Sequence, residues 1–437
     1  MKSCALAFAV LTIGWQASLL ARSVDGPPVP DLPPVSAAEF KRPVVVGWSE
    51  TKTPAALPGF RVERFADGLQ SGRWPYVLPN GDVLVAQART ESMGGFPPEL
   101  LKTFIENGWF GPSADNIVLL RRTQQGIERS IFIEGLNQPF GMLLLDEYLY
   151  VANTDSLVRF RYRDGMTRID APPEKLLDIP SGDQTNPWNN HWTRNLVATP
   201  DGERIMLSVG SGTDANAEGV DPPDRAAIWE LKPDGSGKRL FATGLRNPVG
   251  LDFEPLTGSL WTTVNERDGL GPDLPPDYLT EVVDGGFYGW PYVYYGAYPD
   301  PTQRGINPDK VAAAQDTARV PDLALGGHSV PLGLLFYRGE SFPNKYRRGA
   351  FVVRRAGVGR SVFHGPDVIF LPFENGRPTG SIESFLTGFV ADEQRGEVHG
   401  RPVGMAMLQD GSLLVTDDGA NVIWRVVYHG STGDRTD

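Results

Sequence analysis

Side chains that could do acid–base and anion-binding chemistry recur along the chain, each beside a stretch that contains Pro and Gly. His191, in NPWNNHWTRN (186–195), is a candidate general base because the unperturbed pKa of histidine lies near neutrality. Arg246 and Asn247 in LRNPVG, and Arg401 in GRPVGM, could hold a carboxylate through paired N–H donors. These residue types together predict a site for a small anion or a cofactor, with a base beside it.

Each of these assignments has a structural alternative. His191 could be a histidine that hydrogen-bonds loop backbone, and the same holds for His328 in GGHSVP, which has the same place in its own stretch. The arginines, including Arg355 and Arg360 of VRRAGVGR (353–360), could be solvated and paired with the many acids. Three separate stretches that supply arginine at comparable positions favour the anion site.

The segment NERDGLGPDLPPDYLT (265–280) combines acidic side chains with Gly and Pro. Calcium prefers oxygen ligands, among them the carbonyls of irregular backbone. The segment lacks EF-hand spacing, so it predicts either a calcium site or an acidic surface loop. The histidines show no zinc-ligand spacing.

The elements that must position these side chains are repeats. Six short lead-in stretches each run into an apolar strand that ends in a tight turn: GRWPYV (72–77), LNQPFGM (136–142), HWTRNLV (191–197), LRNPVGL (245–251), HSVPLGL (328–334) and GRPVGM (400–405). The strands that follow begin near residues 78, 144, 199, 254, 347 and 408. Repetition of one unit at a spacing slightly above ~40–50 residues is typical of propeller blades that carry insertions. The sequence therefore predicts an all-β fold, a six-bladed β-propeller with long loop insertions, in which the lead-in residues share one channel mouth.

Composition and charge restrict the partners. The 437-residue chain has a formal net charge of −12, which does not suit binding to nucleic acid or anionic lipid. An apolar run over residues 4–20 follows Lys2, and it is too short for a membrane span but suits a signal peptide. Removal of that segment would take away the single cysteine, Cys4. We therefore expect a periplasmic or secreted protein whose mature chain has no membrane span.

The expected domain organisation follows from these patterns. Residues 1–23 form the signal peptide, 24–57 a Pro-rich leader, 58–428 the propeller and 429–437 a disordered tail. The strand RPVVVG (42–47) or the final strand NVIWRVVY (421–428) is expected to close the ring. Residues 93–113 are expected to include a short amphipathic helix.

Five motifs in this order resemble the glucose/sorbosone dehydrogenase family, and the chain is most similar to the sorbosone dehydrogenase branch over roughly residues 58–428. They are HWTRNL (191–196), LRNPVGL (245–251), NERDGLGPDLPPDYLT (265–280), DGGFYGWPY (284–292) and GRPVGMAM with DGSLLVTDD (400–418). Members of the family are soluble six-bladed propellers that use pyrroloquinoline quinone (PQQ) and calcium. The resemblance implies oxidation of an aldose or other sugar-derived aldehyde or lactol, with a quinone or cytochrome as external electron acceptor.

The resemblance also implies roles for individual residues. His191 would remove the substrate hydroxyl proton, while Arg246 and Asn247 would contact the quinone oxygens. The other implied cofactor contacts are Gln138, Arg355 or Arg360, and Arg401. Calcium would bind backbone carbonyls near Gly271 and Pro272, in the loop that also contains Asp273 and Asp277.

The chain departs from the family pattern in two places. Relatives carry a GQHGSWNR-like segment where this chain has VRRAGVGR (353–360), which changes one wall of the pocket, and Asn190 replaces an aspartate beside the histidine. Two other functions stay open at this point: a calcium-dependent propeller lactonase, and a sugar-binding propeller without catalytic activity. A lactonase would not need several converging arginines.

Overall fold

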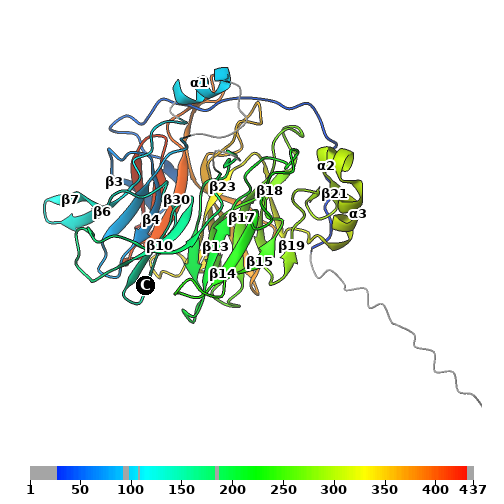
Figure 1. Ribbon diagram of the computed structural model, residues 1–437. Coiled ribbons are helices and arrows are strands. Elements are labelled where there is room, and N and C mark those ends of the chain that lie inside the picture. Colours follow the sequence, from blue (N-terminus) through cyan, green and yellow to red (C-terminus); the bar gives the residue numbers. More distant parts are fainter. Residues whose placement is uncertain (1–26, 92–97, 107–108, 183–186, 431–437) are drawn as a thin grey trace, which may run out of the picture.

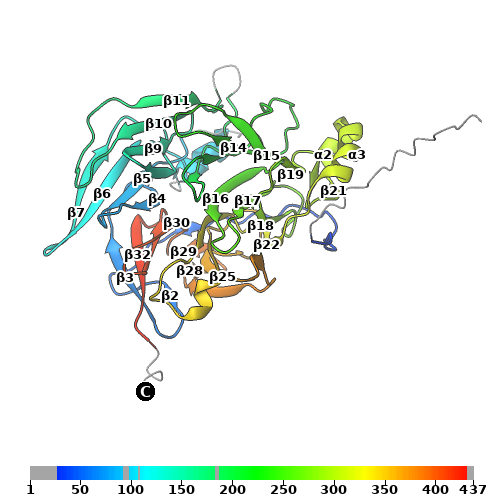
Figure 2. The same cartoon turned by 90° about the horizontal axis from the view of Figure 1, so that it is seen from below.

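Residues 27–91, 98–106, 109–182 and 187–430 are described by the structure, which is a computed structural model of the chain (Figure 1). The expected signal peptide, residues 1–23, lies outside the described residues, as does the expected tail apart from its first two residues. Most of the described chain forms antiparallel β-sheets, and Figure 2 shows these sheets arranged around a centre. The all-β prediction is confirmed.

Six of the sheets in the described part of the chain contain at least four strands, and their first strands contact one another in a closed cycle. The first strands are β4 (Gly72–Val77), β8 (Met142–Leu145), β12 (Leu196–Ala198), β16 (Asn247–Phe253), β23 (Pro331–Phe336) and β30 (Pro402–Met407). Each contacts the next in this order, and β30 contacts β4. This closed arrangement of radial sheets is a β-propeller.

The remaining strands extend each sheet outward from its first strand. The second strands are β5 (Val83–Gln87), β9 (Tyr148–Ala152), β13 (Ile205–Val209), β17 (Leu260–Asn265), β24 (Gly349–Arg354) and β31 (Leu413–Asp417). The third strands are β6 (Asn116–Thr123), β10 (Ser156–Arg161), β14 (Ala227–Leu231), β18 (Pro276–Glu281), β25 (Asp367–Glu374) and β32 (Val422–Tyr428). The fourth strands are β7 (Gly126–Ile133), β11 (Glu174–Asp178), β15 (Arg239–Thr243), β22 (Leu323–Gly327), β27 (Glu383–Thr387) and β3 (Phe60–Ala66).

Ring closure differs in part from the sequence prediction. The final strand β32 belongs to the last sheet, as expected, but its N-terminal partner is β3, which pairs with it antiparallel from Phe60 to Ala66. The predicted closing segment 42–47 instead forms the two-residue strand β1 (Val44–Val45), which runs parallel to β29 (Glu397–Val398). The closing strand therefore comes from the start of the expected propeller domain.

Four of the lead-in stretches, those at 72–77, 245–251, 328–334 and 400–405, are wholly or largely strands, which the sequence prediction missed because Pro and Gly usually interrupt strands. In the other two lead-ins only the last residues, from Met142 and from Leu196, are in strands. In four of the sheets the pairing of the first and second strands shifts register at the lead-in; in β16 this occurs between Pro248 and Leu251, and in β30 between Pro402 and Met405. Such a bulge accommodates a residue that cannot donate a ladder hydrogen bond.

Lead-in glycines lie against the neighbouring sheet. A Cβ added to Gly404 would lie 2.6 Å from the carbonyl oxygen of Arg73, and one on Gly333 would lie 3.0 Å from that of Val403. One on Gly250 would lie 2.7 Å from Leu334 Cβ and 2.8 Å from the Leu332 carbonyl oxygen. The lead-in glycine is therefore required for close contact between first strands of adjacent sheets.

We expect Gly250→Ala to destabilise the protein by about 1–3 kcal/mol, because the added methyl group overpacks a closed contact. Gly305→Ala is the matched control, since a Cβ there meets nothing within 4 Å and the residue lies in a helix. Denaturant unfolding of both variants measures the difference. Equal stability of the two variants would contradict the packing role of Gly250.

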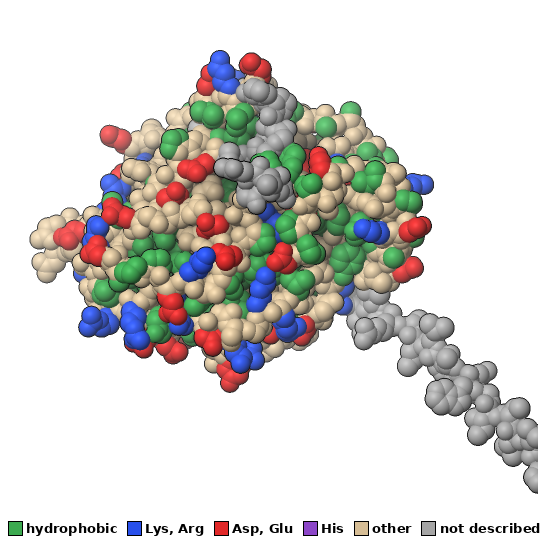
Figure 3. Space-filling view, viewed as in Figure 1, with side chains coloured by type: hydrophobic (Ala, Val, Ile, Leu, Met, Phe, Trp, Pro, Cys, Tyr) green, Lys and Arg blue, Asp and Glu red, His purple; other side chains and the backbone are tan. Residues whose placement is uncertain are grey.

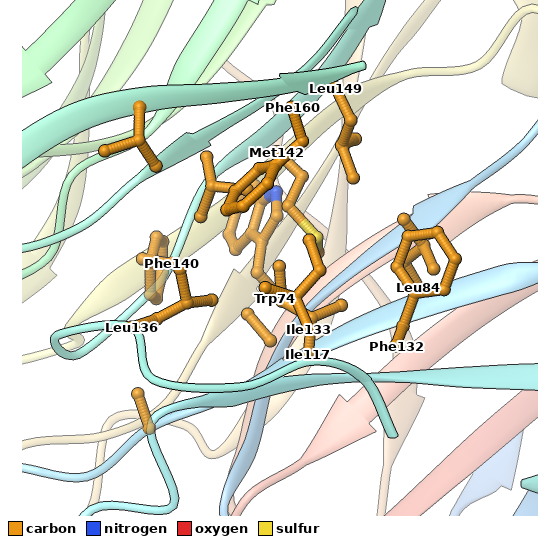
Figure 4. Close-up of a cluster of buried hydrophobic side chains, with 14 of the residues drawn as sticks. Trp74, Leu84, Ile117, Phe132, Ile133, Leu136, Phe140, Met142, Leu149 and Phe160 are labelled. Carbon is orange, nitrogen blue, oxygen red and sulfur yellow. The ribbon is translucent and has the colours of Figure 1, made fainter. Parts of the chain in front are cut away.

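Apolar side chains fill the space between adjacent sheets. Figure 4 shows one such cluster, in which Trp74 from β4 lies among residues of the first and second sheets. The ring centroids of Trp74 and Phe140 are 4.9 Å apart. Strands such as β5 and β31 are buried along their whole length, because neighbouring sheets cover both of their faces.

Insertions and the leader cover one end of the propeller. The helices are α1 (Pro98–Glu106), which confirms the helix expected within 93–113, α2 (Pro301–Ile306), α3 (Pro308–Thr317) and the 3₁₀ helix η1 (Asn344–Arg347). Short strands complete the insertions: β2 (Ala55–Ala56), β19 (Gly286–Phe287), β20 (Val293–Tyr294), β21 (Tyr298–Pro299), β26 (Arg377–Pro378) and β28 (Val390–Asp392). In Figure 1 the leader crosses the top between α2 and α1.

Hydrogen bonds hold the leader along this path. Leu32 N donates to the hydroxyl of Tyr298, Ser36 N to the carbonyl of Leu270, and Lys41 N to that of Val358, at 3.0, 3.1 and 2.9 Å.

Acidic and basic side chains are interspersed on the face seen in Figure 3. No helix within the described ranges is long and apolar enough to cross a membrane.

Candidate active site

Polar lead-in residues of the third and fourth sheets meet at Gly210. A Cβ on this glycine would lie 2.6 Å from His191 Cβ and 2.5 Å from Asn247 Oδ1, so only glycine leaves room for both side chains. Gly210 directly follows β13, and Asn247 begins β16. The structure therefore brings together His191 and Asn247, as the sequence predicted.

Ser211 sets the tautomer of His191. Nδ1 of His191 lies 2.9 Å from both the carbonyl oxygen and the hydroxyl of Ser211. Because a carbonyl oxygen only accepts, Nδ1 carries the proton and Nε2 holds the lone pair. Within the described residues no hydrogen bond to Nε2 is found. His191 is thus in the form that a general base requires.

The surroundings of His191 keep its ring neutral. Burial, followed by the charges of Arg246 and Arg225, lowers the pKa of His191 well below its usual value of 6.5. Orientation of the ring does not depend on the neighbouring Asn190, whose Oδ1 is buried without a hydrogen-bond partner in the described part of the chain. Ser211 has that role, and sequence reasoning missed it because it lies 20 residues from His191.

Two buried arginines fix the backbone around His191. Nη1 of Arg194 and Nη2 of Arg225 donate to the carbonyl oxygen of His191, at 2.6 and 3.1 Å. Both guanidinium groups also donate to Oδ1 of Asn189, at 3.3 and 3.0 Å. Arg194 has no exposed surface and Arg225 only 3%. These residues therefore position the histidine segment, and sequence reasoning missed both.

Arg246 is held by protein acceptors and does not present a free fork. It donates to the carbonyl oxygens of Asp214, Asn265 and Glu266 at 3.0, 3.1 and 2.6 Å, and to the Asp214 carboxylate at 2.6 Å. Its charge lies beside His191 and it fixes the start of the 265–273 loop. Asn247 is 8% exposed, and its Oδ1 has no partner among the described residues.

Three arginines from separate sheets share the carboxylate of Asp418. Arg355 donates to this carboxylate at 2.9 and 3.3 Å, Arg73 forms a buried ion pair with it, and Arg401 Nε lies 3.9 Å away. We call Arg73, Arg355, Arg401 and Asp418 the arginine cluster. The structure brings Arg355 and Arg401 together with Arg73 of the first lead-in. It adds Asp418, which precedes the final turn into β32.

The arginine cluster has donors to spare. Nε and Nη1 of Arg401 and Nε of Arg73 are buried without a hydrogen-bond partner in the described residues. Burial and the charge of Arg355 lower the pKa of Arg401 to about 9, and burial lowers that of Arg73 to about 10. Buried guanidinium groups that repel one another, and some of whose N–H donors have no acceptor in the described residues, fit a ligand that carries carboxylates.

Aromatic rings lie over the arginine cluster and connect it to the histidine. The Arg401 guanidinium is 4.9 Å from the ring centroid of Trp109, and that of Arg73 is 5.4 Å from Trp192, the residue after His191. Trp109 donates to the Pro43 carbonyl of the leader at 3.3 Å. Cations bordered by aromatic faces suit a planar acid.

The remaining predicted cofactor residues lie elsewhere. Gln138 donates from Nε2 to the Arg89 carbonyl at 2.8 Å and has a φ of 44°. Arg360 does not join the arginine cluster, because its Nη1 donates to the carbonyl of Pro272 and to the Asp273 carboxylate, both at 2.6 Å. Arg355 and Arg360, which the sequence offered for the same cofactor contact, therefore have different partners.

The loop expected to hold calcium does not offer a calcium donor set. The Gly271 carbonyl accepts from His328 Nε2 at 3.0 Å, and the Pro272 carbonyl accepts from Arg360. Asp277 is 2% exposed and accepts from Glu266 N, Val330 N and Ser329 Oγ. In the described ranges no group of three or more His, Cys, Asp or Glu side chains could hold a metal. These residues do not fit a calcium ion.

Glu266 is a titratable group at this site that sequence reasoning missed. It is 7% exposed, and burial, opposed by the charge of Arg246, raises its pKa to about 7. A buried carboxyl with a pKa near neutrality is a candidate proton acceptor. Glu266 is part of the segment NERDG (265–269), but sequence reasoning considered the aspartates of this region and not this glutamate.

Comparison with known proteins agrees with the fold. The solved structure of a Trichoderma reesei carbohydrate-active enzyme of family AA12 gives a TM-score of 0.68 at 17% identity, over 86% of this chain and 97% of that one. The PQQ domain of pyranose dehydrogenase from Coprinopsis cinerea gives 0.67 at 17% identity, over 89% and 100%. An uncharacterized protein of Borreliella burgdorferi is 28% identical over 308 residues, which is 67% of this chain and 76% of that protein.

A family match connects this fold to chemistry. Residues 151–354 match the Glucose / Sorbosone dehydrogenase family. This stretch contains the His191 segment, Arg246 with Asn247, and the 265–273 loop, and it supports a sugar oxidoreductase. The resemblance to this family that the sequence motifs suggested is thereby confirmed for residues 151–354.

Proposed function

We propose that this protein oxidises the C1 hydroxyl of an aldose, or a related sugar lactol or aldehyde, with PQQ as the oxidant. The observation that carries the proposal is the combination of a base-form histidine with a buried set of unpartnered arginine donors. Neither the lactonase nor the sugar-binding alternative requires such donors. The pyranose dehydrogenase neighbour, whose described domain is a PQQ domain, supports the choice of cofactor.

The arginine cluster fits the carboxylates of PQQ, which would be held by Arg401 and Arg73 with Arg355 beside them. Asn247 lies beside His191, because its unpartnered Oδ1 and the Cβ of His191 both lie against Gly210. When bound, PQQ supplies a two-electron oxidant that accepts hydride from carbon.

The protein's own residues handle the proton. Nε2 of His191 accepts the proton of the sugar hydroxyl, while Ser211 keeps the other ring nitrogen protonated. Arg194 and Arg225 hold the backbone of the histidine in place. Trp109 and the leader cover the arginine cluster and limit the access of water.

Further details of the proposal come from the sequence. We read the six sheets of at least four strands as six propeller blades, and we place the chain nearest the sorbosone dehydrogenase branch. The apolar N-terminal run supports export to the periplasm or beyond. An exported enzyme would deliver electrons to an external quinone or cytochrome.

Reduction of an artificial dye tests the proposal. We expect purified protein supplied with PQQ to reduce dichlorophenolindophenol when a panel of aldoses is added, and to bind about one equivalent of PQQ by absorbance titration. Lactone hydrolysis without dye reduction would instead support the lactonase. Sugar binding without either reaction would support the non-catalytic propeller.

The pH dependence of the reaction is expected to reflect the lowered pKa of His191. Because burial and two arginines hold that pKa well below 6.5, the ring stays unprotonated through the ordinary histidine range. The acid limb of kcat/KM should therefore lie clearly below pH 6.5. An acid limb at the ordinary histidine value would show that another group acts as the base.

The same shift predicts how stability changes with pH. The folded pKa of His191 lies below the unfolded value of 6.5, so the unfolded chain binds the proton first as pH falls. The contribution of His191 is complete above pH 6.5 and is lost as pH decreases toward the folded pKa. Melting temperatures of wild type and His191→Gln from neutral to acidic pH measure this contribution.

A further inference from the structure

In the loop that the family resemblance assigns to calcium, two side-chain donors bind the expected ligand carbonyls instead. His328 Nε2 lies 3.0 Å from the Gly271 carbonyl oxygen, and Arg360 Nη1 lies 2.6 Å from that of Pro272. Both carbonyls were expected to face a divalent cation. Calcium takes six to eight oxygen ligands, and here two of the expected ligands already accept hydrogen bonds.

Each of the two side chains also contacts a carboxylate of the same loop. His328 Nδ1 lies 3.0 Å from Asp268 Oδ1, and Arg360 Nη1 lies 2.6 Å from Asp273 Oδ1. Both ring nitrogens of His328 are therefore engaged with the loop, and Arg360 binds both a carbonyl and a carboxylate of it.

The chain around this loop holds the side chains of His328 and Arg360 in place. Gly357 N donates to the His328 carbonyl at 2.8 Å, and a Cβ at Gly359 would overlap the His328 ring. The leader fixes the segment that carries Arg360, since Ser361 N donates to Glu39 Oε2 at 2.7 Å. Ser36 N binds the Leu270 carbonyl at 3.1 Å, immediately before Gly271.

A divalent cation at this position would meet unfavourable charge. It would have to displace the two donors from the Gly271 and Pro272 carbonyls while the positive charge of Arg360 stays nearby. Like charges at such short separations repel strongly where water is partly excluded. Asp277 cannot compensate, because backbone and hydroxyl donors already occupy both of its oxygens.

We propose that His328 and Arg360 take the place of the divalent cation at the Gly271–Pro272 carbonyls, so that this protein binds no calcium there. As a consequence, which rests on the proposed function, PQQ binding should not require calcium. The guanidinium group of Arg360 supplies positive charge to this side of the site.

Calcium binding to the full chain tests the proposal directly. Protein stripped with EGTA is exchanged into millimolar CaCl₂, desalted and analysed for metal, and its Tm is measured with EGTA and with CaCl₂. We expect far less than one calcium per chain and equal Tm values. One calcium per chain, with a Tm raised by several degrees, would overturn the proposal.

A PQQ arm separates this inference from the proposed function. PQQ affinity, measured by absorbance titration, should agree within twofold between EGTA and CaCl₂. Saturable PQQ binding that occurs only with CaCl₂ would overturn the inference. If PQQ binds under neither condition, the proposed function fails, whereas the calcium analysis and Tm still decide the inference.

Arg360→Ala provides a second test, with Arg129→Ala as the matched control. Arg129 is also an arginine that donates to two backbone carbonyls, those of Asp67 and Gly68 at 3.0 and 2.7 Å, but on the first sheet. Loss of Arg360 releases the Pro272 carbonyl and the Asp273 carboxylate, two oxygen donors. CaCl₂ should raise the Tm of Arg360→Ala and leave that of Arg129→Ala unchanged. The same response in both variants would contradict the role assigned to Arg360.

Discussion

His191→Ala is expected to lower kcat of the PQQ-loaded protein by a factor of about 10²–10⁴, the usual contribution of general acid–base catalysis. The physical reason is that His191 is neutral, protonated at Nδ1 by its contact with Ser211, and has Nε2 available to accept a proton. PQQ affinity should be nearly unchanged, because the arginine cluster does not contact this ring. Steady-state dye reduction and PQQ titration measure the two effects.

His399→Ala is the matched control. His399 also places Nδ1 against a backbone carbonyl, that of Gly47 at 2.8 Å, but it lies beside Trp48 in the leader region. Its replacement should leave kcat unchanged. If His191→Ala keeps more than about a third of the wild-type activity, His191 is structural. Glu266, whose pKa is about 7, then becomes the next candidate base, because both nitrogens of His328 are engaged.

Arg401→Met is expected to weaken PQQ binding by about 10- to 100-fold, as removal of a charge-assisted hydrogen bond to a ligand carboxylate typically does. The apoprotein should keep its stability, because Asp418 retains Arg73 and Arg355 and because two unpartnered buried donors are removed. The distinguishing result is therefore a loss of affinity without a loss of Tm.

Arg354→Met is the control for this variant. Arg354 is equally buried and next to Arg355, but it forms a bidentate pair with Asp367 at 2.8 and 2.6 Å. Breaking that buried pair should lower Tm and leave PQQ affinity intact. If Arg401→Met and Arg354→Met behave alike, the arginine cluster has a structural role only.

The candidate site is covered by residues outside the six sheets and is not a simple open channel. Trp109 and the leader lie over the arginine cluster, and the leader also fixes the segment that carries Arg360. The sequence predicted an extended leader but not its path, because Pro-rich extended chain has no periodicity that would indicate its contacts. Its path follows from hydrogen bonds to three distant segments.

The prediction of site residues was strongest where it depended on position within a repeat. His191, Asn247 and Arg401 recur at lead-ins, and the closed ring brings lead-ins to one end. The prediction was weakest for the hydrogen-bond and ion-pair partners of these residues. Asp418 is 345 residues from Arg73, and Ser211 is 20 residues from His191, so no local pattern connects either pair.

By itself, the sequence determined the all-β class, the repeated units and the location of the polar lead-ins, because Pro, Gly and strand alternation act over a few residues and leave a readable period. The tertiary structure alone decided which acceptor each donor takes. Arg360 binds the 271–273 loop while Arg355 binds Asp418, although they are five residues apart in the chain. Hydrogen bonds and ion pairs depend on ångström distances between groups that ring closure brings together, and those distances are set by the packing of whole sheets.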